Sequence, residues 1–158
     1  MTKQSDRPVD YAIVSRNQKP MYRTAIAVLK SKTEAEDAVQ DAFVKYFEKR
    51  PAFSSPEHEK AWFLRVTINI CKSRFRSFWW QKTDPLLESH PAQDESQETV
   101  LEAVMQLTPK YRTAIHLYYY EGYNTKEIAE LTSQTEPAVR QQLSRARGLL
   151  KTLLQEDV

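Results

Sequence analysis

Two amphipathic helical patterns separated by a short turn make up the stretch NTKEIAELTSQTEPAVRQQLSRARGLLKTLL, residues 124–154. Asn124 and Glu127 stand at the positions of a capping box, in which two side chains satisfy two amide donors of the first helical turn. Thr135 opens the second pattern and is followed by a carboxylate and a proline, both of which are favourable in a first turn. The stretch therefore predicts two helices joined by a sharp corner, the arrangement of a helix-turn-helix.

The two predicted helices have apolar sides at helical spacing. These sides consist of Ile128, Ala129 and Leu131 in the first helix and Val139, Leu143, Ala146, Leu150 and Leu153 in the second. The outward side of the second helix carries Arg140, Gln141, Ser144, Arg145 and Arg147. Such side chains can bind phosphates and base edges in a major groove. Solvation alone explains most charged helix faces, but two capped helices around a tight turn favour DNA binding here.

The composition indicates a chain of helices without disulfide or metal chemistry. Its 158 residues are 41% hydrophobic and include only two glycines, and few runs alternate as strands do. The single cysteine, Cys71, cannot form an internal disulfide, and the three histidines are too scattered to make a metal site with it. We therefore expect an all-α fold of two small domains that needs no cofactor and no metal.

The sequence carries no sign of secretion or membrane insertion. The segment MTKQSDRPVD is polar, and no apolar run approaches the roughly 18 residues of a membrane span. No phosphate-binding loop or nucleophile–base motif indicates catalysis. We expect a cytoplasmic, non-enzymatic protein without direct membrane insertion.

Charge is distributed unevenly along the chain, although the net charge is only +2. Residues 1–82 hold sixteen Lys and Arg against nine Asp and Glu, whereas residues 83–99 hold five acids and no base. Residues 100–158 carry seven of each sign. A basic block followed by an acidic stretch with proline and serine is typical of a domain that faces nucleic acid and a linker.

The first 49 residues predict two or three helices. Residues 11–29 form either two helices or one helix interrupted at Pro20, and the interruption is the favoured interpretation. Residues 33–49 predict a helix that Thr33 caps with Glu36 at its third position. Its polar face includes Asp37, Gln40 and Asp41, and spacing alone indicates a solvated face.

Residues 50–59 predict a loop, and residues 59–78 predict a further helix. This helix has a basic face with one amide, made of Lys60, Arg65, Asn69, Lys72, Arg74 and Arg76. Aromatic, basic and amide side chains together are typical of sites that hold an unstacked strand, although the pattern by itself is weak. The pair Trp79 and Trp80 fits either a binding feature or an apolar closure of the helix end.

Four blocks taken in order resemble one protein family. They are AEDAVQDAFVKYF (35–47), AWFLRVTINICKSRF (61–75), LTPKYRTAIHLYYYEGYNTKEIAEL (107–131) and VRQQLSRARGLLKTLL (139–154). The chain resembles the bacterial sigma factors of the extracytoplasmic-function type, two-domain subunits that give RNA polymerase its promoter specificity. The resemblance implies a region-2-like helical bundle over residues 1–82, an acidic flexible linker over residues 83–99 and a region-4-like helix-turn-helix domain over residues 100–158.

The resemblance also implies roles for the first domain. In this family the acidic face of the second helix binds the clamp coiled coil of core RNA polymerase, which transfers here to Asp37, Gln40 and Asp41 and replaces the solvated-face interpretation. The next helix and the loop before it melt and recognise the minus-ten promoter element around a flipped base. The matching residues are Phe53, Lys60, Arg65, Asn69, Lys72 and Arg74.

For the second domain, the resemblance implies docking in the major groove of the minus-thirty-five element and on the polymerase flap. Arg140, Gln141, Ser144 and Arg145 take base-facing positions, and Arg147 is better placed for a phosphate. Arginine bound to guanine by two hydrogen bonds is the commonest specific contact, so Arg140 or Arg145 is the first candidate for sequence recognition. The linker then passes along the RNA-exit path of the polymerase. Because the family often has an anti-sigma factor, one is expected as a further partner.

Two segments depart from the pattern of the family. The turn carries Ser133 and Gln134 where a glycine and an aliphatic residue are usual, so the corner is expected to be set differently. The loop FSSPEHEK, residues 53–60, lacks the glycine and second aromatic that are often present. A dimeric helix-turn-helix regulator bound to an operator is the alternative, and two half-sites one helical turn apart would distinguish it.

Overall fold

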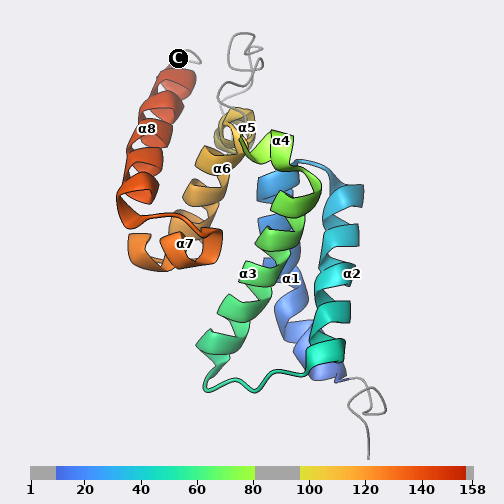
Figure 1. Ribbon diagram of the computed structural model, residues 1–158. Coiled ribbons are helices and arrows are strands. Elements are labelled where there is room, and N and C mark those ends of the chain that lie inside the picture. The colour runs from blue at the N-terminus through green and yellow to red at the C-terminus, as the bar shows by residue number, and fades with distance from the viewer. Residues whose placement is uncertain (1–9, 81–96, 156–158) are drawn as a thin grey trace, which may run out of the picture. The chain divides into compact units, whose positions relative to one another are not determined.

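The computed structural model describes residues 10–80 and 97–155, and these residues form helices and short connections without strands (Figure 1). The chain divides into two compact units, residues 1–74 and 75–158. The expected all-α class with two helical domains is confirmed. Among the described residues, no helix combines the length and the apolar character that crossing a bilayer requires.

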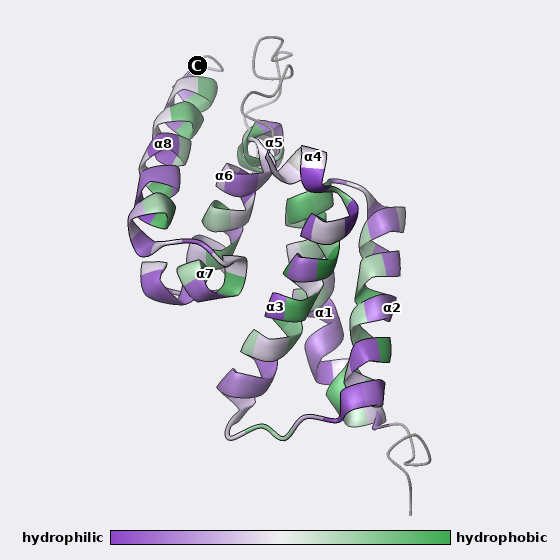
Figure 2. Ribbon diagram, in the orientation of Figure 1, coloured by the Kyte–Doolittle hydropathy of each residue, from purple (hydrophilic) through white to green (hydrophobic). Residues whose placement is uncertain are grey.

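Three long helices build the first unit: α1 (Tyr11–Leu29), α2 (Lys32–Lys49) and α3 (Pro56–Arg74). Each helix packs against the other two, so the unit is a three-helix bundle (Figure 1). Its helices carry hydrophobic and hydrophilic residues side by side, as amphipathic helices around one core do (Figure 2). The largest side chains that are almost fully buried in this core are Met21, Phe63, Leu64 and Ile68.

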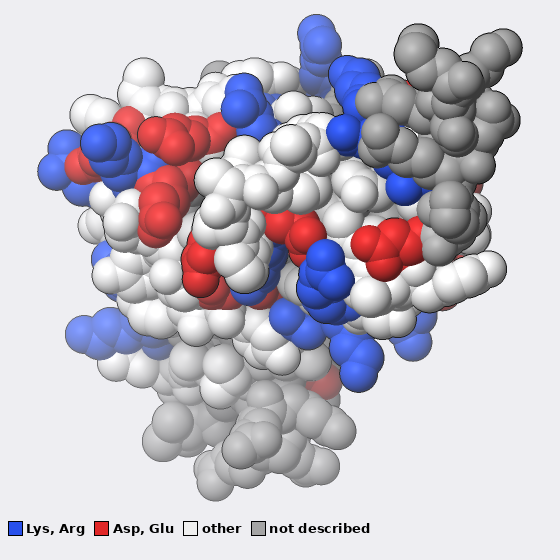
Figure 3. Space-filling model, turned by 90° about the horizontal axis from the view of Figure 1, so that it is seen from below, with Lys and Arg blue, Asp and Glu red and all other residues white. Residues whose placement is uncertain are grey.

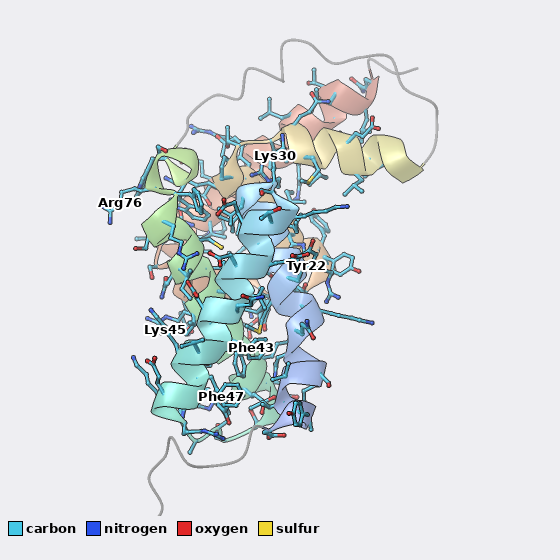
Figure 4. All side chains as sticks on the ribbon, turned by 90° about the vertical axis from the view of Figure 1, so that its right-hand side faces the viewer. Tyr22, Lys30, Phe43, Lys45, Phe47 and Arg76 are labelled. Atoms are coloured by element: carbon cyan, nitrogen blue, oxygen red, sulfur yellow. The ribbon has the colours of Figure 1, made fainter. Side chains whose placement is uncertain are left out.

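Helix α2 shows how this packing orients its two faces. Figure 4 looks onto α2 and shows Phe43 on the side towards α1, with Lys45 on the opposite side. Phe43 is buried and its ring lies 5.4 Å from that of Phe63 on α3. On the same helix Asp37 and Gln40 are exposed and Asp41 is half-buried, so these three side chains lie outside the core of the bundle.

The expected interruption at Pro20 is wrong, because α1 continues through this residue to Leu29. A proline inside a helix removes one backbone hydrogen bond and costs about 3 kcal/mol. The buried side of α1 offsets this cost, since Met21, Ala25 and Val28 are at most 1% exposed in the bundle. Tertiary packing therefore decides against the local preference of proline.

Two predicted helix starts are also corrected. Ser31, not Thr33, is the N-cap of α2, and its hydroxyl accepts a hydrogen bond from the amide of Glu34 at 3.2 Å. Helix α3 begins at Pro56, three residues before the predicted start at Glu59. Ser55 caps it, because the Ser55 hydroxyl accepts from the amide of His58 at 3.0 Å. Proline is favourable in a first turn, so serine and proline together were the signal for this start.

The second unit contains α4 (Arg76–Trp79), α5 (Gln97–Gln106), α6 (Pro109–Ile115), a π-helical turn η3 (His116–Tyr120), α7 (Thr125–Thr132) and α8 (Glu136–Gln155). Helix α8 packs against α5, α6 and α7, and α4 contacts α6. Gly122 follows η3 with a φ of 83°, a left-handed conformation that glycine adopts without strain. The core of the unit includes Leu107, Leu117, Ile128 and Leu143.

The division into compact units falls after Arg74, and the expected domain boundary at residue 82 stays a prediction. Helix α4 groups with the second unit, and its Trp79 is 1% exposed. Trp80 is 58% exposed and has the Lys110 ammonium 3.7 Å from its ring centroid. The two tryptophans therefore have different surroundings. The expected linker, residues 83–99, lies outside the described residues except at its end, where α5 begins at Gln97.

Candidate nucleic-acid interface

The helix-turn-helix begins with the predicted capping box, which is confirmed. The Asn124 side chain accepts from the amide of Glu127 at 2.8 Å, and the Glu127 carboxylate accepts from the amide of Asn124 at 2.9 Å. In the second helix, the Thr135 hydroxyl accepts from the amide of Ala138 at 3.3 Å. Both helices of the motif are therefore fixed at their N-termini by residues that are local in sequence.

Ser133 makes the corner between α7 and α8 by adopting a left-handed backbone. Its φ is 56° and its ψ is 47°, the conformation that a glycine most often supplies at the end of a helix. The amide of Gln134 donates to the carbonyl of Ala129 at 2.9 Å and closes the end of α7. The turn thus keeps the sharp corner of the motif with a serine where the family usually has a glycine.

A pair of glutamine side chains joins this corner to α8. The Gln142 amide nitrogen donates to the Gln134 side-chain oxygen at 2.5 Å, and the return bond between the two side chains is 3.4 Å. Gln134 also donates to the Thr132 hydroxyl at 2.9 Å. Gln142 is only 8% exposed, so its amide depends on this partner. A polar contact therefore takes the place that an aliphatic residue usually has in this turn.

Helix α8 presents all five predicted DNA-binding side chains on one exposed side. Val139, Leu143, Ala146 and Leu153 are buried, whereas the exposed residues are Arg140, Gln141, Ser144, Arg145 and Arg147. Arg140 lies 3.7 Å from the Glu136 carboxylate one turn earlier. For Arg145, no hydrogen bond or ion pair is found within residues 10–80 and 97–155. This side has the donors and the exposure that base and phosphate contacts require.

Arg147 is held by tyrosines of η3, a contact that the sequence analysis missed. Its Nε donates to the Tyr119 hydroxyl at 2.5 Å, and its guanidinium carbon lies 5.4 and 5.5 Å from the ring centroids of Tyr118 and Tyr119. Tyr118, Tyr119 and Tyr120 are 36%, 59% and 65% exposed. The run of three consecutive tyrosines was the available signal in the sequence, because tyrosine combines a large apolar ring with a hydroxyl that forms hydrogen bonds at binding surfaces.

On α3 the structure brings together only part of the expected minus-ten residues. Arg65, Asn69 and Lys72 are spaced by four and three residues and share one side of the helix. Arg65 and Asn69 are exposed and Lys72 is half-buried. Arg74 lies nine residues after Arg65, about two and a half turns, so it faces the opposite side of α3. Lys60 is also out of line with the three, five residues before Arg65.

Phe53, in the loop before α3, is part of an aromatic cluster and not a free side chain. Its ring centroid lies 6.2 Å from that of Tyr46, 5.8 Å from Trp62 and 6.1 Å from Phe63. The His58 ring packs edge-on against it at 5.4 Å. The cluster leaves Phe53 half-buried. One side of its ring therefore supports the loop, and the exposed part is available for stacking.

A buried carboxylate attaches the first turn of α3 to α1. The Arg16 guanidinium donates to both oxygens of Glu59, at 2.7 and 2.9 Å, and the Asn17 amide donates to Glu59 at 2.8 Å. Hydrogen bonding from Arg16, partly opposed by burial, lowers the pKa of Glu59 below its usual value. Arg16 itself remains half-exposed. The contact fixes the end of the loop that contains Phe53.

The carboxylates expected to bind the polymerase already have a partner within the first unit. The Arg74 guanidinium forms ion pairs with Asp37 and with Asp41, through a different nitrogen to each. Asp37 and Gln40 are exposed, and Asp41 is half-exposed. Arg74, predicted to lie near DNA, thus lies with the residues predicted to bind polymerase.

Charges of both signs are mixed on the face that Figure 3 draws, where Lys and Arg are interspersed with Asp and Glu. Within the described residues, no group of His, Cys, Asp and Glu could hold a metal ion. Burial raises the pKa of the Cys71 thiol to about 12, so this thiol stays protonated near neutral pH. The candidate binding sites are therefore identified by the exposed side chains of α2, α3 and α8.

Two family models match the chain in sequence order. Residues 13–81 match sigma-70 region 2, and residues 97–150 match sigma-70 region 4. The two matches leave uncovered only the ends of the chain and residues 82–96. Both halves of the molecule are therefore assigned to regions that sigma-70 proteins contain in this order.

Curated relatives extend the similarity over nearly the whole chain. The extracytoplasmic-function sigma factor SigM of Mycobacterium tuberculosis is 27% identical over 154 residues, which are 94% of this chain and 79% of the relative. SigV of Bacillus subtilis, an RNA polymerase sigma factor, is 27% identical over 163 residues, 98% of this chain and 96% of the relative.

One solved structure has a similar fold over almost the full length of both chains. It is the sigma factor RpoE of Bartonella quintana, crystallised in complex with the anti-sigma factor NepR. The TM-score is 0.70 at 24% sequence identity, and the match covers 94% of this chain and 98% of that one. At this identity the likeness supports the fold.

Proposed function

The chain belongs to the sigma-70 family, as an RNA polymerase sigma factor of the extracytoplasmic-function type, and we propose how its side chains share the work of promoter recognition. As a sigma factor it binds core RNA polymerase and directs promoter-specific initiation at minus-ten and minus-thirty-five elements. The two region matches in their family order favour this function over a dimeric operator-binding regulator.

Recognition of the minus-thirty-five element is assigned to α8. The exposed side that carries Arg140, Gln141, Ser144 and Arg145 enters the major groove, because this side opposes the buried stripe of the helix. Arg145 is the first candidate for a base contact, since Arg140 lies near Glu136 and Arg147 is bound to Tyr119. Arg147 then contacts a phosphate, which fixes register without recognising sequence.

Recognition of the minus-ten element is assigned to α3 and the loop before it. Arg65, Asn69 and Lys72 form the strand-facing side, and Lys60 and the exposed part of Phe53 contribute at the loop end. Aromatic stacking contributes about 1–3 kcal/mol per base, which offsets the few kcal/mol that unstacking a base costs. The residues proposed for this element come from residues 1–82, the region-2-like domain.

Binding of core polymerase is assigned to Asp37, Gln40 and Asp41 on the outer side of α2, towards the clamp coiled coil. The region-4-like domain, residues 100–158, contacts the flap, and residues 83–99 connect the two along the RNA-exit path. An anti-sigma factor is proposed as a further partner, as in the Bartonella complex. We infer that the protein acts in the cytoplasm as a regulatory DNA-binding subunit, without catalysis and without a metal or cofactor.

The exposed side of α8 carries this proposal, and reconstitution tests it. Purified protein added to core RNA polymerase is expected to give transcripts with defined start sites from genomic fragments. Aligned upstream sequences of these start sites will contain two elements at a constant spacing. A protein that binds neither core polymerase nor promoter DNA, and gives no specific transcript, would refute the proposal.

A further inference from the structure

Arg74 connects the end of α3 to the outer side of α2. Its two terminal nitrogens bind two carboxylates, Asp37 and Asp41, which are one helical turn apart on α2. The rigid planar guanidinium holds its donors in fixed directions and binds one carboxylate with each terminal nitrogen, whereas a lysine would offer a single ammonium on a flexible stem. All three side chains keep more than a third of their surface exposed, so another molecule can reach the ion pairs.

The direction of Arg74 excludes it from the strand-facing side of α3. Arg65, Asn69 and Lys72 share one side of this helix, and Arg74 lies about half a turn away from Arg65 around the axis. The Arg74 side chain therefore neutralises part of the acidic face of α2 and does not extend the basic face of α3. Any cationic group that approaches Asp37 and Asp41 meets a guanidinium already bound there.

We propose that Arg74 is an internal competitor on the core-polymerase-binding surface: it occupies Asp37 and Asp41 in the free protein and yields them to a cationic side chain of the polymerase. This inference rests on the proposed function of the two carboxylates. It requires that the polymerase present an arginine or lysine to this face, because only a cationic side chain can replace Arg74 in the ion pairs with Asp37 and Asp41. The exchange lowers the apparent affinity for polymerase by the strength of the internal pairs.

The internal pairs are weak enough to be exchanged and strong enough to be measured. Exposed ion pairs change binding equilibria by roughly two- to fivefold, and salt reduces the effect. Arg74→Ala is therefore expected to bind core polymerase about two- to fivefold more tightly than the native protein at low salt. The gain decreases as the salt concentration rises. Arg74→Lys keeps the positive charge but loses the two terminal nitrogens of the guanidinium. Its affinity for core polymerase is expected to lie between those of the native protein and of Arg74→Ala.

Affinity for core polymerase is measured by titration with fluorescently labelled full-length protein. Arg76→Ala is the matched control, because it removes the same charge two residues away from an exposed position and breaks neither ion pair. Its affinity should stay within measurement error of the native value. Thermal unfolding of each variant shows that the fold is retained.

The Asp37→Asn, Asp41→Asn double variant separates this inference from the proposed function. If it binds core polymerase as well as the native protein does, the proposed function of the two carboxylates fails. If it binds more weakly, those residues are the site, and Arg74→Ala in this background should then have no effect. Unchanged or weaker core binding by Arg74→Ala alone, with the carboxylates still required, overturns the inference and leaves the proposed function intact.

Discussion

Glu59 is a buried charged side chain that links α3 to α1 in the first unit. It is 8% exposed and receives three hydrogen bonds, two from Arg16 and one from Asn17. Such bonds to a charged group contribute about 1.5–3 kcal/mol when buried, and the half-exposed Arg16 reduces this figure. Glu59→Gln is therefore expected to lower the free energy of unfolding by about 1–2 kcal/mol, measured by urea denaturation at neutral pH.

The lowered pKa of Glu59 predicts that the free energy of unfolding depends on pH. The pKa of Glu59 is lower in the folded protein, so the unfolded chain binds its proton more readily and stability rises with pH. The contribution is complete above the pKa of an unfolded glutamate, about 4.3, and is lost as the pH falls through the lower folded value. Glu59→Gln should show a smaller loss of stability over this acidic range. An identical acid loss in both proteins would contradict the assignment.

Ser133 stores a modest strain that glycine would relieve. Its φ of 56° is costly for a side chain with a Cβ, by about 1–2 kcal/mol, whereas glycine loses about 0.4–1 kcal/mol more chain entropy on folding. Ser133→Gly is expected to raise the free energy of unfolding by about 0.5–1 kcal/mol. Ser133→Val, which is branched at Cβ, should lower it. Chemical denaturation of both variants tests the sign.

The π-helical turn η3 and helix α8 act together through Tyr119 and Arg147. The Tyr119 hydroxyl accepts a hydrogen bond from Nε of Arg147. This bond fixes the orientation of the guanidinium, while its two terminal nitrogens do not take part in the bond. A guanidinium held in this way loses less freedom when it binds a phosphate. Tyr119 is therefore a positioning residue for the proposed phosphate contact of Arg147.

Variants at this pair should weaken DNA binding without changing sequence preference. Arg147→Ala is expected to lower affinity for minus-thirty-five DNA similarly for matched and mismatched sites, and to reduce the salt slope by about one. Tyr119→Phe keeps the ring but loses the hydroxyl, so it should cause a smaller uniform loss and no further loss in the Arg147→Ala background. Tyr120→Phe is the matched control. A change in base preference with Arg147→Ala would assign this arginine to a base instead.

For the whole molecule, we propose that the first unit binds core polymerase and the second unit recognises the minus-thirty-five element. One variant in each unit tests this assignment. Asp41→Arg places a cation where polymerase is expected to bring its own, and should weaken core binding at least tenfold through charge repulsion. Arg145→Ala should cost about 1–3 kcal/mol of discrimination at one base pair and leave core affinity unchanged. Binding to core polymerase and transcription from promoter variants measure the two effects. Equal loss of both activities in either variant would contradict this assignment of the two units.

Local signals predicted the helix-turn-helix of the second unit, whereas α4, α5, α6 and η3 were not predicted individually. The capping box of Asn124 and Glu127, the start of α8 and the exposed side with Arg145 follow from spacings of three and four residues along one helix. The first unit was predicted less well at its boundaries. Two serines and one proline gave competing start signals for α2 and α3, and the core packing of α1 prevailed over Pro20.

Sequence by itself determined the helical class, the order of the blocks and the side of α8 that faces outward, because helical periodicity and capping depend on neighbouring residues. Only the tertiary structure decided the partners of Arg16, Arg74 and Arg147, which lie 43, 37 and 28 residues from Glu59, Asp37 and Tyr119. Such pairs depend on how helices pack, and periodicity within one helix does not encode that packing. For this reason Arg74 was expected beside DNA and lies instead on the acidic face of α2.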